Sequence, residues 1–224
     1  MLDESQVDAP WSAPAERDVA APPQPTRREA EEAVRTLIRW AGDNPSREGL
    51  RDTPARVVRA YREWFAGYFE DPDALLQRTF DEVGGYSEAV LLRDIPVQST
   101  CEHHMGAIRG VAHIAYLPNG RVVGISKLAR LVDALSRRLQ IQERLTAEIA
   151  AALERALKPR GVAVVIEAQD ECMSSRGVRK HGARLVTRSF GGIYRSDPGR
   201  AAAMDLLAMG GRREPLGCCG HQID

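Results

Sequence analysis

The chain has no excess of charge of either sign. Its 224 residues include 31 lysines and arginines and 31 aspartates and glutamates, so the formal net charge at pH 7 is zero. Domains that bind nucleic acids generally carry a basic excess, so this balance argues against that class of protein. It leaves open a local basic pocket for a small anion. The length suits one domain that buries its own core.

Long apolar runs are also missing. No segment approaches the length of a membrane span. The first 18 residues, MLDESQVDAPWSAPAERD, are acidic and contain no apolar core. This composition excludes a secretory signal, and a transit peptide would be basic and poor in acidic residues. We therefore expect a soluble, cytoplasmic protein without a membrane or nucleic-acid partner.

Cysteine is scarce. The four cysteines are Cys101, Cys172, Cys218 and Cys219, which is too few for a disulfide scaffold. In a cytosolic chain, a few cysteines near histidines indicate metal binding or catalysis. Cys218, Cys219 and the nearby His221 lie in a segment without a hydrophobic pattern. We interpret that segment as a flexible surface tail; the other hypothesis is a metal or redox element.

Composition divides the chain into four regions. Residues 1–25 are rich in proline, alanine and charge, which predicts a disordered arm. Residues 26–80 carry helical signals and are predicted to form a helical N-terminal region. Residues 89–197 are expected to form the main domain. Residues 199–224 are interpreted as a flexible tail.

The helical region has recognisable start signals. Thr26 together with Glu29 fits a capping box. Thr53 is suited to an N-cap, and Pro54 to the first position of the helix that follows it. A short further helix is expected over residues 73–79. These signals predict a helical arm in front of the main domain.

The pattern changes from about Ala89. It predicts, in order, strand, strand, helix, helix, strand and strand over Val111–Leu117, Val122–Ile125, Lys127–Leu139, Gln142–Leu157, Val162–Ala168 and Arg184–Tyr194. The first two strands flank Pro118-Asn119-Gly120, a hairpin turn signal, and the last two are expected to pair. This order gives an α+β fold, an antiparallel sheet with two helices on one face. Its open edges favour a homo-oligomer.

Cys101-Glu102-His103-His104 is the most specific short motif. Cys101 and His104 are three residues apart, so a thiolate and an imidazole can bind one Zn²⁺. Cys172, just after the predicted Val162–Ala168 strand, completes a Cys₂His site with an open fourth position. An open zinc site lowers the pKa of bound water to about 7, which suits hydrolysis. The alternative is that the cysteines are buried apolar side chains and the histidines form surface hydrogen bonds.

Other polar residues suggest how a substrate is held. His103 is a candidate general acid or base, because adjacent strand residues point to opposite faces and it cannot easily share the metal. Lys127 and Arg130 lie one turn apart at a predicted helix start, where free N–H groups also favour a phosphate. The alternative for each basic residue is a solvated helix surface. A carboxylate such as Glu143 can accept two hydrogen bonds from the edge of guanine.

The stretch from Cys101 to Gly192 closely resembles the GTP cyclohydrolase I family, the zinc enzymes that open pterin biosynthesis. The matching blocks are CEHH, YLPNGRVVGISKLARLVDALSRRLQIQERLT and ECMSSRGV, and the helix start RDTPARVVRAY is also similar. Together they extend over residues 28–197. The resemblance implies a tunnelling fold with β-β-α-α-β-β order, assembled into a ring, commonly a decamer, with active sites at subunit interfaces.

The resemblance also implies a role for each matching residue. It implies that zinc is bound by Cys101, His104 and Cys172, and that His103 is catalytic. It also implies that guanine is recognised by Gln142 and Glu143, that the triphosphate is bound by Lys127, Arg130 and Arg176, and that Ser126 lies on the ribose and phosphate side. The implied reaction begins with attack by zinc-bound hydroxide at C8 of GTP. The imidazole ring opens, C8 leaves as formate, and a pyrazine ring closes. The product is 7,8-dihydroneopterin triphosphate, an early compound of tetrahydrofolate biosynthesis.

The sequence departs from the family at Asp170, because a histidine is usual two residues before the late zinc cysteine. An aspartate of ordinary pKa is ionised at pH 7 and accepts protons without donating them, and burial beside a metal shifts that pKa in either direction. In one hypothesis Asp170 serves as a base or orients water in the full reaction. In others the reaction stops at a ring-opened formamidopyrimidine, or the chain serves a specialised pterin or deazapurine pathway.

A non-catalytic, nucleotide-binding ring subunit is the competing hypothesis outside the enzyme class. The retained metal ligands, His103 and Glu143 argue against it. A zinc site with only structural use is also disfavoured, because three ligands leave the coordination sphere incomplete. The sequence therefore predicts a zinc-dependent enzyme acting on GTP.

Overall fold

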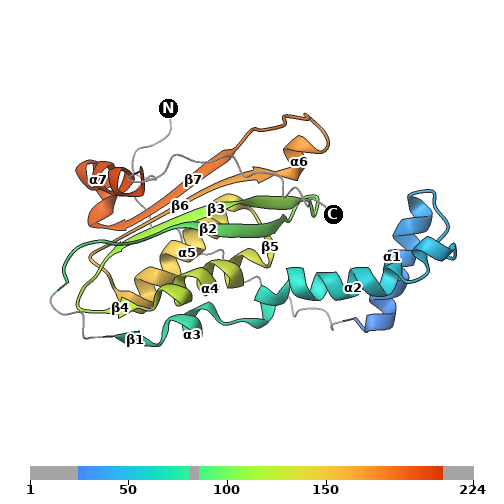
Figure 1. Cartoon of the computed structure of the whole chain (residues 1–224), viewed down its shortest axis with the longest axis horizontal. Helices are drawn as coiled ribbons and strands as arrows, with labels where there is room; N and C mark the ends of the chain where they lie inside the picture. The colour runs from blue at the N-terminus through green and yellow to red at the C-terminus, as the bar shows by residue number, and fades with distance from the viewer. Residues whose placement is uncertain (1–24, 81–85, 209–224) are drawn as a thin grey trace, which may run out of the picture.

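The computed structural model describes residues 25–80 and 86–208, and the fold is described for these residues. The predictions for residues 1–24 and for Cys218, Cys219 and His221 lie outside them. Figure 1 shows an elongated molecule in which a helical arm extends from one end of a sheet packed on helices. The described part of the chain includes no helix that combines the length and apolar character needed to cross a membrane.

The helical arm contains α1 (Arg27–Trp40), the 3₁₀ turn η2 (Glu48–Leu50) and α2 (Thr53–Trp64). The predicted capping box is confirmed, because the Thr26 side chain accepts from the Glu29 N–H and the Glu29 carboxylate accepts from the Thr26 N–H. Helix α2 starts one residue earlier than predicted, with Asp52 rather than Thr53 at the N-cap. No residue of α1 is buried, so the arm gains little from packing within one chain.

Three short elements connect the arm to the main domain. After η3 (Ala66–Phe69), helix α3 covers Pro72–Leu76 and strand β1 covers Thr79–Phe80. The predicted helix over residues 73–79 is therefore too long at its C-terminal end. Residues 79–80 are extended because they pair antiparallel with β4 (Val122–Val123).

The main sheet has five strands in the order β5-β2-β3-β6-β7. They are β5 (Leu139–Gln140), β2 (Val90–Cys101), β3 (Ala107–Leu117), β6 (Gly161–Asp170) and β7 (Leu185–Gly192). Neighbours are antiparallel except β2 and β5. The predicted α+β fold and the pairing of the last two strands are confirmed.

The predicted hairpin across Pro118-Asn119-Gly120 is wrong. Strand β3 already has β2 on one edge and β6 on the other, so no edge remains for β4. Strand β4 instead pairs with β1. The partner of β3 is β2. We expected the Cys101–His104 motif at a strand end but predicted no bounds for that strand, because its alternation is broken by a register shift between Leu92 and Ile95, where Asp94 adopts a positive φ.

Helices α4 (Ile125–Ser136) and α5 (Gln142–Leu157) cover one face of the sheet, as predicted (Figure 1). The bounds of α5 match the prediction, whereas α4 ends before Leu139 because that residue belongs to β5. The core between the layers is formed by residues at helical spacing, such as Leu128, Leu131, Leu145, Ile149 and Leu153, packed against Ile108, Ile114 and Ile166 of the sheet.

The other face of the sheet is covered at one end by α7 (Asp197–Ala208), which follows the 3₁₀ turn η4 (Ile193–Arg195). We expected residues 199–224 to be a flexible tail. The structure corrects this for residues 199–208, because Ala203 and Leu207 are buried with Val165 and Tyr194 in a second apolar cluster. The hydrophobic pattern of this helix is weak in sequence, since one of its buried residues is the small Ala203 and the neighbouring Ala201 and Ala202 are exposed.

Candidate functional site

A tight turn carries the Cys-Glu-His-His motif from β2 to β3. The Cys101 N–H donates to the Gly106 carbonyl at 2.8 Å, and the Met105 N–H donates to the Cys101 carbonyl at 2.8 Å. Met105 has a positive φ of 55°, which closes the turn. Cys101 is buried, whereas residues 102–105 are exposed. The motif therefore presents one thiol to the interior and its polar side chains to the surface.

The end of β6 lies against this turn because β6 pairs with the start of β3. Asp170 is opposite Ile108 in the register. It also caps the short helix α6 (Glu171–Ser174), since Asp170 Oδ1 accepts from the Cys172 N–H at 2.7 Å. A Cβ added at Gly106 would lie 3.1 Å from Cys172 Sγ. The turn and α6 thus approach each other closely enough that glycine is favoured at position 106.

This contact forms a candidate metal centre. The thiols of Cys101 and Cys172 and a carboxylate oxygen of Asp170 lie within 4.8 Å of one another. Burial, followed by hydrogen bonds to Asp170 and Cys101, raises the pKa of the Cys172 thiol to about 12. Groups whose anionic forms repel one another gain by sharing a divalent cation, and two sulfurs with an oxygen or nitrogen donor are the chemistry that Zn²⁺ prefers. The residues present therefore fit zinc.

The two histidines lie in the exposed part of the turn. His103 Nδ1 is 4.0 Å from Cys101 Sγ, and its side chain is 65% exposed. His103 Nε2 is 4.0 Å from Glu102 Oε1. The ring centroids of His103 and His104 are 6.5 Å apart. His104 is three residues from Cys101, but it does not belong to the group formed by Cys101, Asp170 and Cys172 in the described residues.

The N-terminus of α5 lies at the same end of the sheet. Strand β5 pairs with the end of β2, with Gln140 opposite Cys101, so α5 begins beside the candidate metal centre. Glu143 is exposed there. Gln142 is buried, and its Nε2 donates to the Ile166 carbonyl at 3.1 Å, the Leu185 carbonyl at 3.0 Å and Thr187 Oγ1 at 3.0 Å. Gln142 therefore anchors α5 to β6 and β7, a role that sequence reasoning missed.

Arg176 and the basic residues of α4 lie at different ends of the chain's fold. Arg176 is exposed and follows α6 closely. Ser126, Lys127 and Arg130 occupy the start of α4, which begins at the opposite end of the sheet from α6 (Figure 1). Lys127 is nine residues from Ser136, so it lies about 14 Å along the helix from the end nearer the metal centre. One chain does not bring these residues together.

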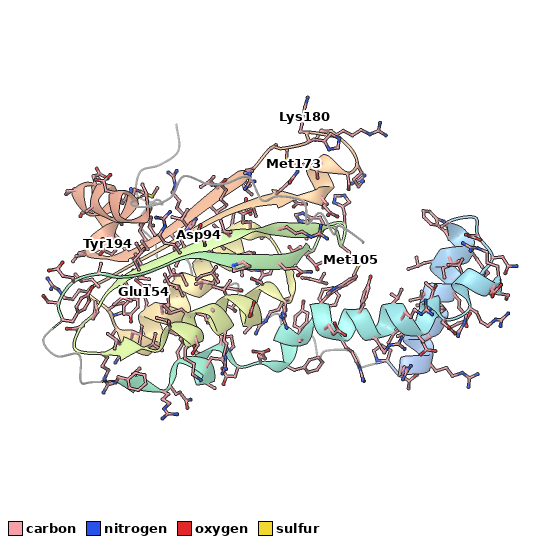
Figure 2. All side chains as sticks on the ribbon, viewed as in Figure 1. Asp94, Met105, Glu154, Met173, Lys180 and Tyr194 are labelled. Carbon is pink, nitrogen blue, oxygen red and sulfur yellow. The ribbon has the colours of Figure 1, made fainter. Side chains whose placement is uncertain are left out.

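The side chains labelled in Figure 2 show the two ends of the main sheet. Met105 of the turn and Met173 of α6 lie at the end with the candidate metal centre, whereas Glu154 and Tyr194 lie towards the other. A groove of about 830 Å³ also lies near the turn, bounded by Met105, Gly106 and the last residues of α2. Neither cysteine of the centre lines it.

Comparison with known proteins decides the family. The sequence model described as GTP cyclohydrolase I matches residues 30–208. The chain belongs to the GTP cyclohydrolase I family. A relative named GTP cyclohydrolase 1, from Sinorhizobium fredii (strain NBRC 101917 / NGR234), is 55% identical over 187 residues, covering 84% of this chain and 91% of the relative.

Among solved structures, the apo crystal structure of the archaeosine synthase QueF-Like is similar with a TM-score of 0.41 and 19% identity, covering 48% of this chain and 96% of that one. The family assignment made from the sequence blocks is confirmed by the family model and the curated relative. At Asp170 the resemblance to the family leads us to expect a histidine. Here its carboxylate both caps Cys172 and faces the two thiols.

Proposed function

We propose that this chain hydrolyses GTP to 7,8-dihydroneopterin triphosphate and formate, the first step of pterin and tetrahydrofolate biosynthesis. Its family membership and the 55% identical relative named GTP cyclohydrolase 1 support this activity. The observation that carries the proposal is the convergence of Cys101, Asp170 and Cys172 beside the exposed Glu143 at the start of α5. A metal-binding group and a guanine-recognising carboxylate then share one end of the sheet.

Zinc is the cofactor in this proposal. Cys101 and Cys172 would hold it, and His104 would supply the third ligand from the exposed turn. Bound zinc supplies a water of lowered pKa, which makes hydroxide available at neutral pH. Burial raises the pKa of the Cys172 thiol, and a thiol binds zinc as the thiolate, so binding of the ion would release its proton.

Each of the remaining site residues has its own role in the proposed reaction. Glu143 accepts the N–H and NH₂ edge of guanine, a bidentate contact suited to a carboxylate. Gln142 fixes the start of α5 through the hydrogen bonds of its buried side chain to β6 and β7. His103, exposed in the turn, moves protons during ring opening and formate release. Asp170 replaces the usual histidine by accepting a proton or orienting the attacking water, while its other oxygen holds the Cys172 N–H.

The substrate site is completed by a second chain. Ser126, Lys127 and Arg130 lie on the far end of the sheet from Cys172, so they cannot bind the triphosphate of the same GTP within one chain. We infer that they act across the interface of a ring-shaped homo-oligomer with a tunnelling fold, a decamer in most of the family. Open sheet edges support this, because β7 has no partner on its outer side in the described residues and β5 pairs with only Thr100 and Cys101 of β2.

Product identification tests the proposed activity. We expect zinc-loaded protein to consume GTP and to release formate together with a pterin that fluoresces after oxidation. Mass spectrometry identifies both products. A formamidopyrimidine without formate would show that the reaction stops after ring opening. Consumption of another purine nucleotide in place of GTP would indicate a specialised pathway, and no consumption of any would leave a nucleotide-binding subunit.

Mixing two inactive variants tests the shared site. The Lys127→Ala variant loses a triphosphate contact but keeps the metal centre, whereas Cys172→Ala loses the metal centre but keeps Lys127. If each site takes these residues from two chains, dissociating and reassembling the two variants together restores part of the activity. We expect about a quarter of native sites to be intact in a random mixture in which each site uses two chains. Mixtures as inactive as the separate variants would place both residues in one chain's site.

A further inference from the structure

Arg144 hydrogen-bonds to three residues near the candidate site, and the proposed chemistry gives it no role. It is the third residue of α5. Its Nη2 donates to the Glu102 carboxylate and to the Leu139 carbonyl at 3.0 Å, and its Nε donates to Gln140 Oε1 at 2.9 Å. One guanidinium therefore joins the metal-binding turn, strand β5 and helix α5. We call Glu102, Leu139, Gln140 and Arg144 the Arg144 clamp.

Gln140 fixes the clamp from the interior. Its side chain is 2% exposed, and its Nε2 donates to the Leu135 carbonyl at 3.1 Å and to Glu148 Oε2 at 2.8 Å. Its main-chain carbonyl accepts from the Glu102 N–H at 3.0 Å. Glu102 is thus bound to β5 through its backbone and to α5 through its side chain. Because both the nitrogen and the oxygen of this buried amide are hydrogen-bonded, the residues around it are held in one geometry.

Glu102 is the residue through which the clamp reaches the catalytic turn. It stands between Cys101, a proposed zinc ligand, and His103, the proposed acid–base residue. Its Oε2 accepts from Arg144, and its Oε1 lies 4.0 Å from His103 Nε2. Its side chain is 33% exposed and that of Arg144 is 27% exposed. A half-buried, charge-assisted contact is stronger than an ion pair in open solvent.

We propose that Arg144 is a positioning residue: through Glu102 it fixes the turn that carries Cys101 and His103 relative to Glu143 on α5. The catalytic part of the inference rests on the proposed function. The distance between the metal-bound and the guanine-bound ends of the substrate site is set by two elements, the turn and the helix start. Arg144 is bonded to both, and the reacting groups lose alignment when these elements shift by about an ångström.

The Arg144→Lys variant tests the role. Lysine keeps the positive charge, but its ammonium cannot reproduce the planar fork that serves Glu102, Leu139 and Gln140 together. We expect kcat for formate release from GTP to fall about tenfold to a hundredfold, with KM changed less than about threefold because Glu143 is untouched. Zinc content stays at the native level. Hydrogen exchange of the amides at 102–106, measured by mass spectrometry, becomes at least tenfold faster.

Arg155→Lys is the matched control. Arg155 lies on the same helix and forms an exposed pair with Asp73 at 2.9 Å, far from the turn. Its replacement leaves kcat and the exchange of residues 102–106 at native values. Glu102→Gln provides the second variant, since it removes the charge partner but leaves Arg144 bonded to β5. In the double variant E102Q/R144K the loss of kcat is no larger than the greater of the two single losses, because both changes break one contact.

The outcomes distinguish the structural role of Arg144 in holding the turn from its effect on catalysis. Native kcat and native exchange in Arg144→Lys overturn it. If that variant loses zinc or unfolds, Glu102→Gln decides, and unchanged exchange at 102–106 in it also overturns the clamp. If the native protein does not act on GTP, the proposed function fails, while the exchange measurement still determines whether Arg144 holds the turn.

Discussion

Replacing Cys172 with alanine is expected to remove zinc and to reduce the rate of formate release by at least about a thousandfold. The change deletes one of two thiols in the candidate metal centre. With a thiol missing, Cys101 and the turn cannot hold the ion alone. Water that is no longer activated by zinc has a pKa near 15.7 rather than about 7, so little hydroxide forms at neutral pH. Zinc is measured by elemental analysis of the dialysed protein.

Met173→Ala is the control for the cysteine variant. Met173 is the next residue of α6 and is 46% exposed, so this change alters the same helix without touching the ligand group. It is expected to keep native zinc content and native rate. If Cys172→Ala retains one zinc per chain, then Cys172 is not a ligand and the proposed site must be rebuilt around other donors.

The variants His104→Ala and Asp170→Ala are expected to separate zinc binding from proton transfer. Removing His104 takes away the third ligand, so zinc affinity falls at least a hundredfold in competition with a chelator, and turnover is lost with it. Removing Asp170 leaves the three ligands in place. It costs about 1 kcal/mol of stability through the lost cap on Cys172 and lowers the rate about 10²-fold to 10⁴-fold by removing a proton acceptor.

The reversed pattern would change the ligand set. If Asp170→Ala loses zinc while His104→Ala keeps it, the cluster of Cys101, Asp170 and Cys172 is itself the metal site. Asp170→His then adds a further comparison. It introduces the histidine that the family resemblance leads us to expect here and should preserve or raise pterin formation; a sharp loss would show that the aspartate has a specialised role in this chain.

Local signals in the sequence predicted several elements well. The capping box at Thr26 and Glu29, the bounds of α5 at Gln142–Leu157 and the buried strand near Val162–Ala168 were confirmed. Each depends on neighbours within one helical turn or one strand, so the local pattern carries the information. The CEHH, YLPNGRVVGISKLARLVDALSRRLQIQERLT and ECMSSRGV blocks were long and specific enough to identify the family.

Long-range partners were harder to predict. Strand β4 has a turn signal on its N-terminal side, but its partner is β1, more than forty residues earlier in the chain. The periodicity of β2 is interrupted near Asp94. Helix α7 packs through Ala203 and Leu207, which give it too short an apolar pattern to stand out in the sequence. Pairing and packing of this kind depend on which edges and faces other elements leave free.

The sequence by itself determined the family, the α+β fold class and the residue types that can bind zinc, guanine and phosphate. Tertiary structure decided which of them meet. The antiparallel register of β3 and β6 brings Asp170 and Cys172 to the turn after Cys101, and the parallel pairing of β5 with β2 places Arg144 against Glu102. The tertiary structure also places Lys127 at the other end of the sheet. Such distances follow from strand pairing between distant segments, which no local pattern encodes.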